Sequence, residues 1–220
     1  MKENLNVLTN FEKINFKKNF VFCALNLAYV SYKLNGKIKK IKNVFLWCDG
    51  IFAKLFVNSK KIPGSKILNY FIKNKYINQI VVIGSSSKNQ KKYLINKFKL
   101  KVKIINLPNI RFDDLKNFVP KLSKSSLILI TLPTPKQEEF ARQIIKKNKY
   151  YKIICIGGGL AIASGDIKDC PKFMNKLGLE FIWRLRTDTT RRLARLFYSF
   201  IIFCFFKLIG KTKELNFIKN

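Results

Sequence analysis

The chain contains no histidine among its 220 residues. That absence excludes Ser-His-Asp and Cys-His catalysis, and it excludes any metal site built on imidazole. Cysteine is sparse as well: the five cysteines are widely spaced and form no Cys-x-x-Cys pair, which argues against a disulfide framework or a zinc site and favours a reducing cytosol. With these groups missing, carboxylates are the natural general bases of any active site.

Long apolar segments are also missing. The apolar run 196–206 has 11 residues before Lys207 interrupts it, whereas a membrane-spanning helix needs about 20. The run is too short to cross a bilayer, but it is long enough to lie in the surface of one. The N-terminus, which begins Met1-Lys2-Glu3, lacks the apolar core of a signal peptide. We therefore expect neither a spanning helix nor a secretory leader.

Arginine is scarce, and where it does occur it is clustered. It accounts for seven of the 44 basic residues, and five of those seven stand between Arg184 and Arg195. Lysine is a point charge on a flexible stem, whereas arginine is a planar fork that can hold a phosphate or carboxylate with two hydrogen bonds. The cluster leads directly into the apolar run 196–206. This order indicates a site for a phosphorylated substrate beside a membrane.

The charge as a whole is much less specific. A net charge of +32 permits binding to nucleic acid, anionic lipid or a polyanionic substrate, and a solvated lysine surface explains it equally well. No nucleic-acid motif accompanies the charge, so binding to nucleic acid is only an alternative hypothesis. With 48% apolar residues, the chain can build a sizeable core, and its length suits one domain or one domain with an appendage.

Short apolar runs alternate with helix-like segments through most of the chain. Continuous apolar runs are typical of strands buried on both faces of a parallel sheet, and the runs are Asn19–Ala24, Val44–Trp47, Gln79–Ile83, Val102–Ile105, Leu127–Leu132 and Ile153–Ile156. Helical spacing, with lysine on the outer face, occurs in Ser65–Tyr76, Lys88–Phe98 and Gln137–Lys147. This alternation predicts an α/β fold with a Rossmann-like, mostly parallel sheet and helices on both faces.

The alternation stops after Gly178. The segment from Phe181 to Ile209 has the spacing of one or two amphipathic helices, and no further strand is expected after it. We therefore divide the chain into an α/β core at residues 1–180 and a basic, aromatic helical appendage at residues 181–220. The appendage is expected to associate with a membrane.

Ligands of open α/β sheets bind beyond the carboxyl ends of the strands, and polar or glycine-rich groups follow almost every predicted strand. Asp49 offers the sharpest chemistry, because a partly desolvated carboxylate there could act as a general base. An ordinary Asp-Gly turn that caps the next helix is the alternative. Gly157 and Gly158 begin a glycine-rich loop of the kind that lets backbone N–H groups approach a phosphate. Gly84-Ser85-Ser86-Ser87 has the same character, or is a turn with a capping serine.

Two further groups complete the candidate site. Gln137 stands at the expected start of a helix and can hydrogen-bond a sugar. Arg184, Arg191 and Arg195 share one face of a helix, and they serve either a diphosphate or anionic lipid. No Asp-x-Asp occurs, so the sequence shows no sign of the metal site with which many sugar-nucleotide transferases hold the diphosphate.

Taken in order, several of these residues resemble the WecG/TagA/CpsF glycosyltransferase family over about residues 20–200. The resemblance is carried by Asn26, Asp49-Gly50, Pro63-Gly64-Ser65, Pro135-Lys136-Gln137-Glu138, Gly157-Gly158-Gly159, Gly178-Leu179-Glu180, Trp183-Arg184-Leu185 and Arg191-Arg192-Leu193. It implies transfer of an N-acetylhexosamine-type sugar, such as N-acetylmannosamine, from a UDP-sugar to a polyprenyl-diphosphate-linked sugar in cell-surface polysaccharide synthesis. Inversion, no metal or other cofactor, and a peripheral position on the cytoplasmic face of the cell membrane are also implied.

The resemblance also implies roles for individual residues. Asp49 looks like the catalytic base, and Asn26 and Gln137 look like contacts to the donor sugar. Arg184, Arg191 and one of Arg192 or Arg195 look like the arginines that close over the diphosphate. The partners implied are the UDP-sugar, the lipid-linked acceptor, an anionic membrane surface and, by self-association, further copies of the chain, with no nucleic acid.

The sequence departs from the family pattern at several positions, including Ala24, Lys66 and Ala161-Ile162. These departures leave the donor sugar open. They also motivate a second hypothesis, a catalytically degenerate family member that binds the membrane.

Overall fold

A computed structural model describes the chain except at residues 1, 12–13, 51–52, 72–74, 108–109, 172, 175–176, 178, 180–181, 184–188 and 220, and it does not describe the side chains of residues 54–55, 189 and 191–193. The centre of the fold is an eight-stranded sheet of order β5-β4-β6-β7-β2-β3-β1-β8. Every strand pair is parallel. The strands are β1 (Glu3–Val7), β2 (Phe20–Leu25), β3 (Val44–Cys48), β4 (Gln79–Gly84), β5 (Lys101–Asn106), β6 (Ser126–Ile130), β7 (Lys152–Cys155) and β8 (Leu215–Lys219).

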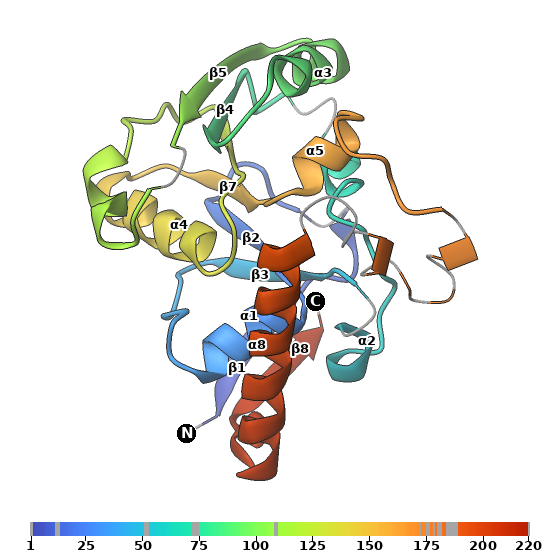
Figure 1. The fold of residues 1–220 in the computed structure, drawn as a ribbon. Helices are drawn as coiled ribbons and strands as arrows, with labels where there is room; N and C mark the ends of the chain where they lie inside the picture. The colour runs from blue at the N-terminus through green and yellow to red at the C-terminus, as the bar shows by residue number, and fades with distance from the viewer. Residues whose placement is uncertain are drawn as a thin grey trace.

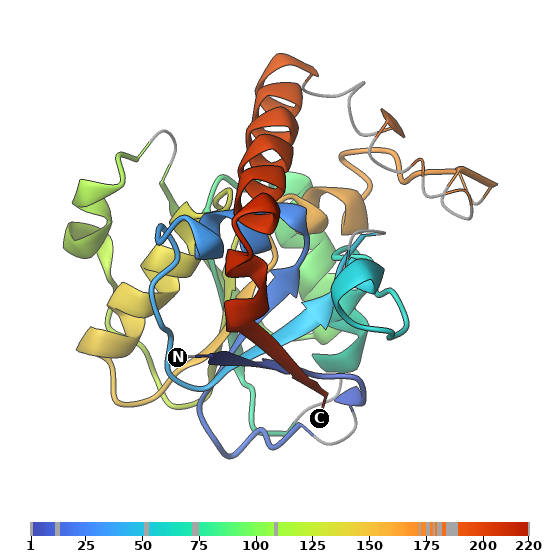
Figure 2. The ribbon, with the colours of Figure 1, turned by 90° about the horizontal axis from the view of Figure 1, so that it is seen from below.

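Helices cover both faces of the sheet (Figures 1 and 2). One face carries α1 (Leu27–Leu34), α4 (Lys136–Lys147), α8 (Thr189–Leu208) and the 3-10 helix η3 (Asp113–Phe118). The other face carries α3 (Lys88–Phe98), α5 (Gly159–Ala163) and the 3-10 helix η2 (Ile67–Phe71). Two short elements, α2 (Ala53–Phe56) and η4 (Lys211–Glu214), complete the described helices. The predicted α/β fold is confirmed.

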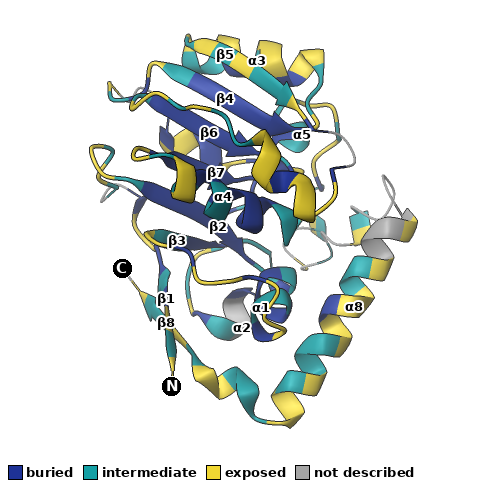
Figure 3. Cartoon of the chain, turned by 90° about the vertical axis from the view of Figure 1, so that its left-hand side faces the viewer, coloured by how far each residue is buried: buried dark blue, intermediate teal, exposed yellow. Residues whose placement is uncertain are grey.

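The strands have continuous apolar sequences because successive side chains point to opposite faces of the sheet and both faces are buried. In β2, Val21, Cys23 and Leu25 face the core beneath α1, whereas Phe20 and Phe22 face the core beneath η2. Figure 3 shows the central strands as a buried layer between the helices. All six predicted strands are present within two residues of their expected bounds.

Two of the three predicted helices of the core are confirmed, and the third is much shorter than expected. Lys88–Phe98 is α3, and Gln137–Lys147 is α4 extended by one residue. The predicted helix Ser65–Tyr76 contains only the 3-10 helix Ile67–Phe71 among its described residues. Its apolar side chains Ile67, Leu68 and Phe71 are all buried, so a single short helix already brings this segment's apolar groups into the core.

The expectation that no strand follows Gly178 was wrong. β8 pairs in register with β1, from Glu3 opposite Leu215 to Val7 opposite Lys219. β8 is the edge strand and β1 lies next to it. Polar residues interrupt both strands, so neither has the continuous apolar run that marks a central strand. The C-terminal segment therefore returns to the core and completes the sheet.

Helix α8 has two unlike faces. Its inner face packs on α1, where the Ser31 hydroxyl donates to the Ser199 carbonyl at 2.6 Å and the rings of Tyr32 and Tyr198 lie 5.5 Å apart. Its outer face is apolar and exposed, with Phe197, Phe200, Ile201, Phe205 and Leu208 each at least half exposed. Figure 3 shows α8 beginning on the side where the strands end and running back past α1 toward β8.

The crossover connections define where a ligand binds in such a sheet. The chain leaves β4 toward β5 at one side and leaves β6 toward β7 at the other, so the direction of winding reverses between the adjacent strands β4 and β6. Ligands of open α/β sheets bind beyond the carboxyl ends of strands near such a reversal. The residues that follow β4, β6, β7, β2 and β3 are therefore the ones to consider.

Candidate functional site

Asp49 immediately follows β3, and a returning loop holds its carboxylate. The Ile62 N–H donates to the Cys48 carbonyl at 2.8 Å, which brings the loop back over the end of the strand. The Gly64 N–H then donates to Asp49 Oδ1 at 3.2 Å across 15 residues of sequence. The carboxylate is thus held by a backbone amide as well as by its own strand.

The glycine-rich loop after β7 packs directly against Gly64. A Cβ added to Gly159 would lie 2.8 Å from the carbonyl carbon of Gly64 and 3.1 Å from Ile156 Cγ1, closer than real Cβ contacts allow. A Cβ on Gly64 would lie 3.8 Å from Gly159 Cα and 4.0 Å from Asp49 Oδ2. Gly159 therefore permits the close approach that places the glycine loop beside the Asp49 carboxylate.

The same loop has little backbone N–H capacity left for a phosphate. The Gly157 N–H donates to the Ile130 carbonyl and the Gly159 N–H donates to the Ile156 carbonyl, each at 3.0 Å. Gly157 has φ +52°, which favours glycine. Of the two predicted substrate-binding glycines, Gly158 is therefore the better candidate for a phosphate contact, because the N–H group of Gly157 is already hydrogen-bonded within the protein.

Gln137 reaches this loop from the start of α4. A Cβ on Gly157 would lie 3.6 Å from Gln137 Oε1, so the amide oxygen lies against the glycine loop. The Gln137 Nε2 group donates to Thr134 Oγ1 at 3.0 Å and to Glu138 Oε1 at 2.9 Å. Gln137, the glycine loop, Gly64 and Asp49 form one continuous set of contacts at the carboxyl edge of the sheet.

Glu138 lies just behind Gln137 and is almost fully buried. Burial raises the pKa of its carboxyl to about 7, against the lowering effect of hydrogen bonds from Gln137, its own backbone amide and Thr134. A carboxyl with a pKa near neutrality at the edge of a ligand site is a functional candidate. In the sequence, Glu138 stood out only as part of the Pro135-Lys136-Gln137-Glu138 motif.

Asn26 is the N-cap of α1, a role that was not predicted from the sequence. Its side-chain oxygen accepts a hydrogen bond from the Tyr29 N–H at 3.0 Å and caps α1. The cap uses Oδ1 and fixes the side chain at the end of β2. The cap leaves the amide nitrogen, Nδ2, and the second lone pair of Oδ1 for other hydrogen bonds.

The ends of β4 and β6 pack closely together at the same edge of the sheet. Gly84 has φ +128°, and a Cβ there would lie 2.4 Å from Thr131 Oγ1. The Thr131 hydroxyl donates to the Ser85 carbonyl at 3.0 Å. Ser87 caps α3 by accepting from the Gln90 N–H at 3.1 Å, which confirms the capping interpretation of this serine. This pair of strand ends forms a rigid wall of the site.

The segment after α5 is hydrogen-bonded to the start of α3. The Ser87 hydroxyl and the Gln90 amide both donate to Asp166 Oδ2, at 2.5 Å and 2.9 Å. The hydrogen bond from Ser87 is the main cause of the lowered pKa of Asp166. Trp183 Nε1 in turn donates to the Lys168 carbonyl at 3.1 Å. The chain that leads into the arginine cluster is therefore anchored beside α5.

Part of the arginine cluster lies outside the described residues. This applies to Arg184 and Arg186 as a whole and to the side chains of Arg191 and Arg192. Arg195 is described, and its charge acts on the Tyr32 phenol of α1. The backbone of Arg191 and Arg192 stands in the first turns of α8, which begin on the carboxyl-edge side of the sheet (Figure 3).

A comparison with known protein families bears on these contacts. Residues 7–215 match the Glycosyl transferase WecG/TagA/CpsF family. The chain belongs to this family. Members of the WecG/TagA/CpsF family are glycosyltransferases of cell-surface polysaccharide synthesis, so the substrates of the protein are a sugar donor and an acceptor. The match covers both the sheet and α8, so the arginine cluster and Asp49 both lie within the part of the chain that the family shares.

The structure shows which contacts the residues of the family motifs make. Pro63-Gly64-Ser65 supplies the amide that holds Asp49, and Gly157-Gly158-Gly159 supplies the close contact with Gly64. Pro135-Lys136-Gln137-Glu138 begins α4 after a cis Thr134–Pro135 bond. The roles of Gly64, Thr134 and Glu138 were missed. Gly64 and Glu138 stood in quoted motifs, whereas nothing in the sequence singled out Thr134.

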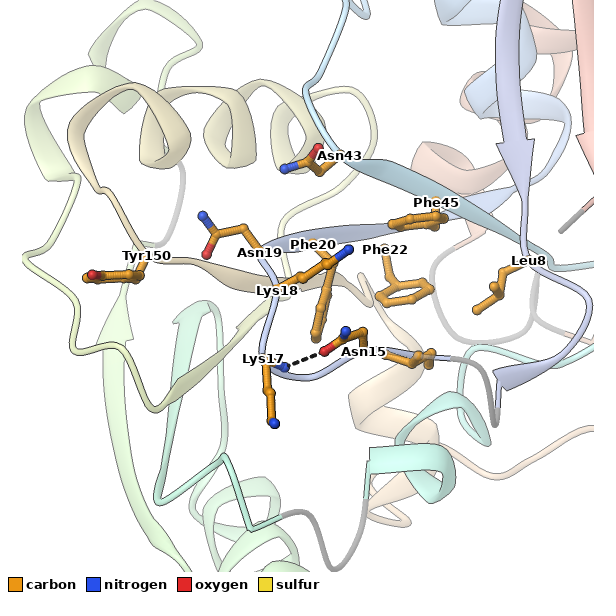
Figure 4. A pocket seen from close by; sticks show the side chains of 11 residues that line it. Leu8, Asn15, Lys17, Lys18, Asn19, Phe20, Phe22, Asn43, Phe45 and Tyr150 are labelled. Atoms are coloured by element: carbon orange, nitrogen blue, oxygen red, sulfur yellow. Dashed lines mark hydrogen bonds between the residues drawn. The ribbon is translucent and has the colours of Figure 1, made fainter.

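A pocket of about 560 Å³ lies at the opposite edge of the family sheet, at the starts of β2, β3 and β7 (Figure 4). Phe22 and Phe45 line it together with several lysine and asparagine side chains. Its polar groups already serve the fold: Asn15 Oδ1 accepts from the Lys17 N–H, and Asn19 bonds the backbone of Lys149 and Tyr151. The carboxyl edge that carries Asp49 therefore stays the candidate site.

Among the described residues, no cluster of three or more His, Cys, Asp or Glu side chains could hold a metal ion. No helix within the described part of the chain is long and apolar enough to cross a membrane.

Proposed function

We propose that the protein transfers an N-acetylhexosamine-type sugar from a UDP-sugar to a polyprenyl-diphosphate-linked sugar acceptor, with inversion and without a metal. The observation that carries this proposal is the set of contacts that joins Asp49 to Gly64 and Gly159. It holds a carboxylate beside the glycine loop at the ligand-binding edge of a glycosyltransferase sheet. Membership of the WecG/TagA/CpsF family supplies the reaction class.

Asp49 is the general base in this proposal. The acceptor hydroxyl oxygen attacks the anomeric carbon of the donor while the bond from that carbon to the diphosphate oxygen breaks. Asp49 takes the hydroxyl proton, and UDP leaves with the bonding electron pair. A single displacement of this kind inverts the anomeric configuration. With no histidine in the chain, a carboxylate is the natural group for the proton transfer.

The remaining site residues bind the donor. Gln137 presents its amide oxygen beside Gly157, and Asn26 has its amide nitrogen available once Oδ1 caps α1. These two groups are suited to the hydroxyl and acetamido groups of a sugar. Gly158 and the arginines of the cluster stabilise the negative charge that develops on the leaving diphosphate, which is the largest catalytic contribution in such sites. The absence of Asp-x-Asp in the sequence supports charge neutralisation by arginine.

The apolar faces support a position at a membrane surface. The outer face of α8 exposes Phe197, Ile201 and Phe205, and the segment before it exposes Phe173 and Leu177. In Figure 2 α8 rises from the top of the body and the segment before it extends to the right of the helix. Apolar groups flanked by lysines favour the interface of an anionic bilayer. A lipid-linked acceptor would then meet the site from the membrane, and we place the protein on the cytoplasmic face.

A panel of UDP-sugars tests the function. The purified protein is incubated with each UDP-N-acetylhexosamine and with a polyprenyl-diphosphate-sugar acceptor in anionic liposomes, in the presence of EDTA. We expect one donor to give a lipid-linked product whose new linkage has the opposite anomeric configuration to the donor. A protein that binds UDP but transfers no sugar would support the degenerate alternative, and retention of configuration would exclude Asp49 as the base of a single displacement.

A further inference from the structure

Three polar side chains form a triad at the start of α4: Gln137 and Glu138 are buried in its first turn, and the half-buried Thr134 precedes the helix. Gln137 is 4% exposed and Glu138 is 1% exposed. The amide nitrogen of Gln137 donates to Glu138 Oε1 at 2.9 Å and to Thr134 Oγ1 at 3.0 Å. The Thr134 hydroxyl then donates to Glu138 Oε1 at 3.2 Å. Both N–H groups of the Gln137 amide are thus engaged inside the protein.

This arrangement fixes which end of the Gln137 amide meets the ligand. With the nitrogen turned inward, Oε1 lies against Gly157, 3.6 Å from the position of a Cβ there. Among the described residues, Gln137 Oε1 is buried and has no hydrogen-bond partner. A buried acceptor without a partner is costly. Glu138 Oε2 in the same triad also has no partner among these residues, but Oε1 of Gln137 is the one that faces the glycine loop. Oε1 faces the glycine loop of the site, and less than 1 Å² of the atom is exposed, so that loop must shift for a sugar to reach it.

We propose that Glu138 is a positioning residue that holds the Gln137 amide with its oxygen toward the donor sugar, where it accepts a hydrogen bond from a sugar O–H or acetamido N–H. This inference rests on the proposed function, because it takes the ligand at this edge to be a UDP-sugar. The chemistry of Glu138 explains this orientation. A carboxylate accepts hydrogen bonds and cannot donate them, so an amide of Gln137 turned the other way would place its oxygen against the carboxylate oxygen of Glu138.

The protonation state of Glu138 controls the strength of this lock. Burial raises the pKa of its carboxyl to about 7. The titratable groups that face it are Cys23 on β2, Cys155 on β7 and Tyr29 on α1, whose pKa values are raised from ordinary values of 9.0, 9.0 and 10.0, so none of them ionises near neutrality. A neutral carboxyl can donate a hydrogen bond and so tolerates the reversed amide. The lock therefore tightens as pH rises through about 7.

The test compares Glu138→Gln with Glu139→Gln. Glu139 is the neighbouring buried carboxylate, but it pairs with Arg142, so its replacement controls for a glutamine in the same turn. Nuclear magnetic resonance first follows the side-chain amide signals of Gln137, assigned by their loss in Gln137→Met, from pH 5.5 to 8.5. We expect a shift with a midpoint near 7 in the wild type and in Glu139→Gln, and no such titration in Glu138→Gln.

Calorimetry then measures binding of UDP and of UDP-N-acetylmannosamine at pH 8. We expect Glu138→Gln to weaken the UDP-sugar roughly three- to tenfold, the worth of one hydrogen bond, and to leave UDP unchanged, with Glu139→Gln equal to the wild type for both. A Gln137 signal that does not titrate, or UDP-sugar affinity equal in Glu138→Gln and the wild type, overturns the inference. A titrating Gln137 in a protein that binds neither ligand leaves the lock in place and overturns the proposed function instead.

Discussion

Replacing Gly159 by alanine tests the contact that brings the glycine loop to Asp49. The added Cβ would lie 2.8 Å from the carbonyl carbon and 3.0 Å from the carbonyl oxygen of Gly64, and 3.1 Å from Ile156 Cγ1. Two of these three neighbours are backbone atoms and cannot rotate away. The two loops must therefore separate by several tenths of an ångström. That movement pulls the Gly64 amide away from Asp49 Oδ1, which it now meets at 3.2 Å.

The size of the effect follows from this overlap. Overpacking of this kind costs roughly 1–3 kcal/mol, and a displacement approaching 1 Å in an active site can cost up to about 100-fold in rate. Alanine also favours helix over glycine by up to about 1 kcal/mol. Gly158→Ala is the matched variant for stability, because its Cβ would have no neighbour within 4 Å. We expect Gly159→Ala to be about 1–3 kcal/mol less stable than Gly158→Ala.

Urea denaturation and the sugar-transfer assay measure the two consequences. Gly159→Ala should have a lower midpoint than Gly158→Ala and should lose about 10- to 100-fold in transfer rate relative to the wild type. If Gly159→Ala were as stable as Gly158→Ala and transferred sugar at the wild-type rate, the close approach of the two loops would not be what positions Asp49.

Three further predictions concern other parts of the molecule. The pKa of Glu138 rises from 4.5 to about 7 on folding, so its contribution to stability is complete below pH 4.5 and is lost as pH rises through 7. Relative to Glu138→Gln, the wild type should lose roughly 3 kcal/mol between pH 4.5 and 8, and parallel denaturation curves would contradict this. Gly84→Ala should cost about 2 kcal/mol or more, because its φ of +128° and the 2.4 Å approach of Thr131 Oγ1 both oppose a Cβ; an unchanged melting temperature would refute the close packing of β4 and β6. Ile201→Ser with Phe205→Ser should leave stability within about 0.5 kcal/mol and weaken binding to anionic liposomes about tenfold or more; equal co-sedimentation would remove α8 from the membrane contact.

Point substitutions test the C-terminal segment better than a deletion does. Removing the chain after residue 180 would remove β8 together with α8, and β8 pairs along the whole length of β1. Phe203, Phe206 and Phe217 also pack against the core beneath the sheet. A deletion would therefore damage the fold along with any site, whereas the exposed face of α8 can be changed without loss of core contacts.

The central fold could be predicted because burial on both faces leaves a clear pattern. In β2 and β6 every side chain is buried, so the sequence is continuously apolar and the strands are evident. The edge strand β8 and its neighbour β1 are only partly buried and carry polar residues among the apolar ones, a pattern that a highly charged chain produces in many places. Their pairing joins the two ends of the chain and leaves no local signal.

The candidate site was predictable at strand ends and not beyond them. Asp49 and Gln137 follow β3 and β6, so the rule of the carboxyl edge was enough to find them. The role of Gly64 depends on how a loop folds back, and the orientation of Gln137 depends on two side chains that surround it. Such three-dimensional contacts have no counterpart in spacing. Asn26 shows the converse, because one residue serves as a helix cap and remains a candidate for the sugar.

The central claim is that Asp49 removes the acceptor proton. Its most direct test is a single-turnover sugar-transfer assay with Asp49→Asn, which keeps the size of the side chain and an oxygen for the Gly64 amide. We predict that this variant keeps its melting temperature and its affinity for UDP and loses transfer by a factor of about 100 or more. Transfer by Asp49→Asn at the wild-type rate, with the same pH dependence, would contradict the account.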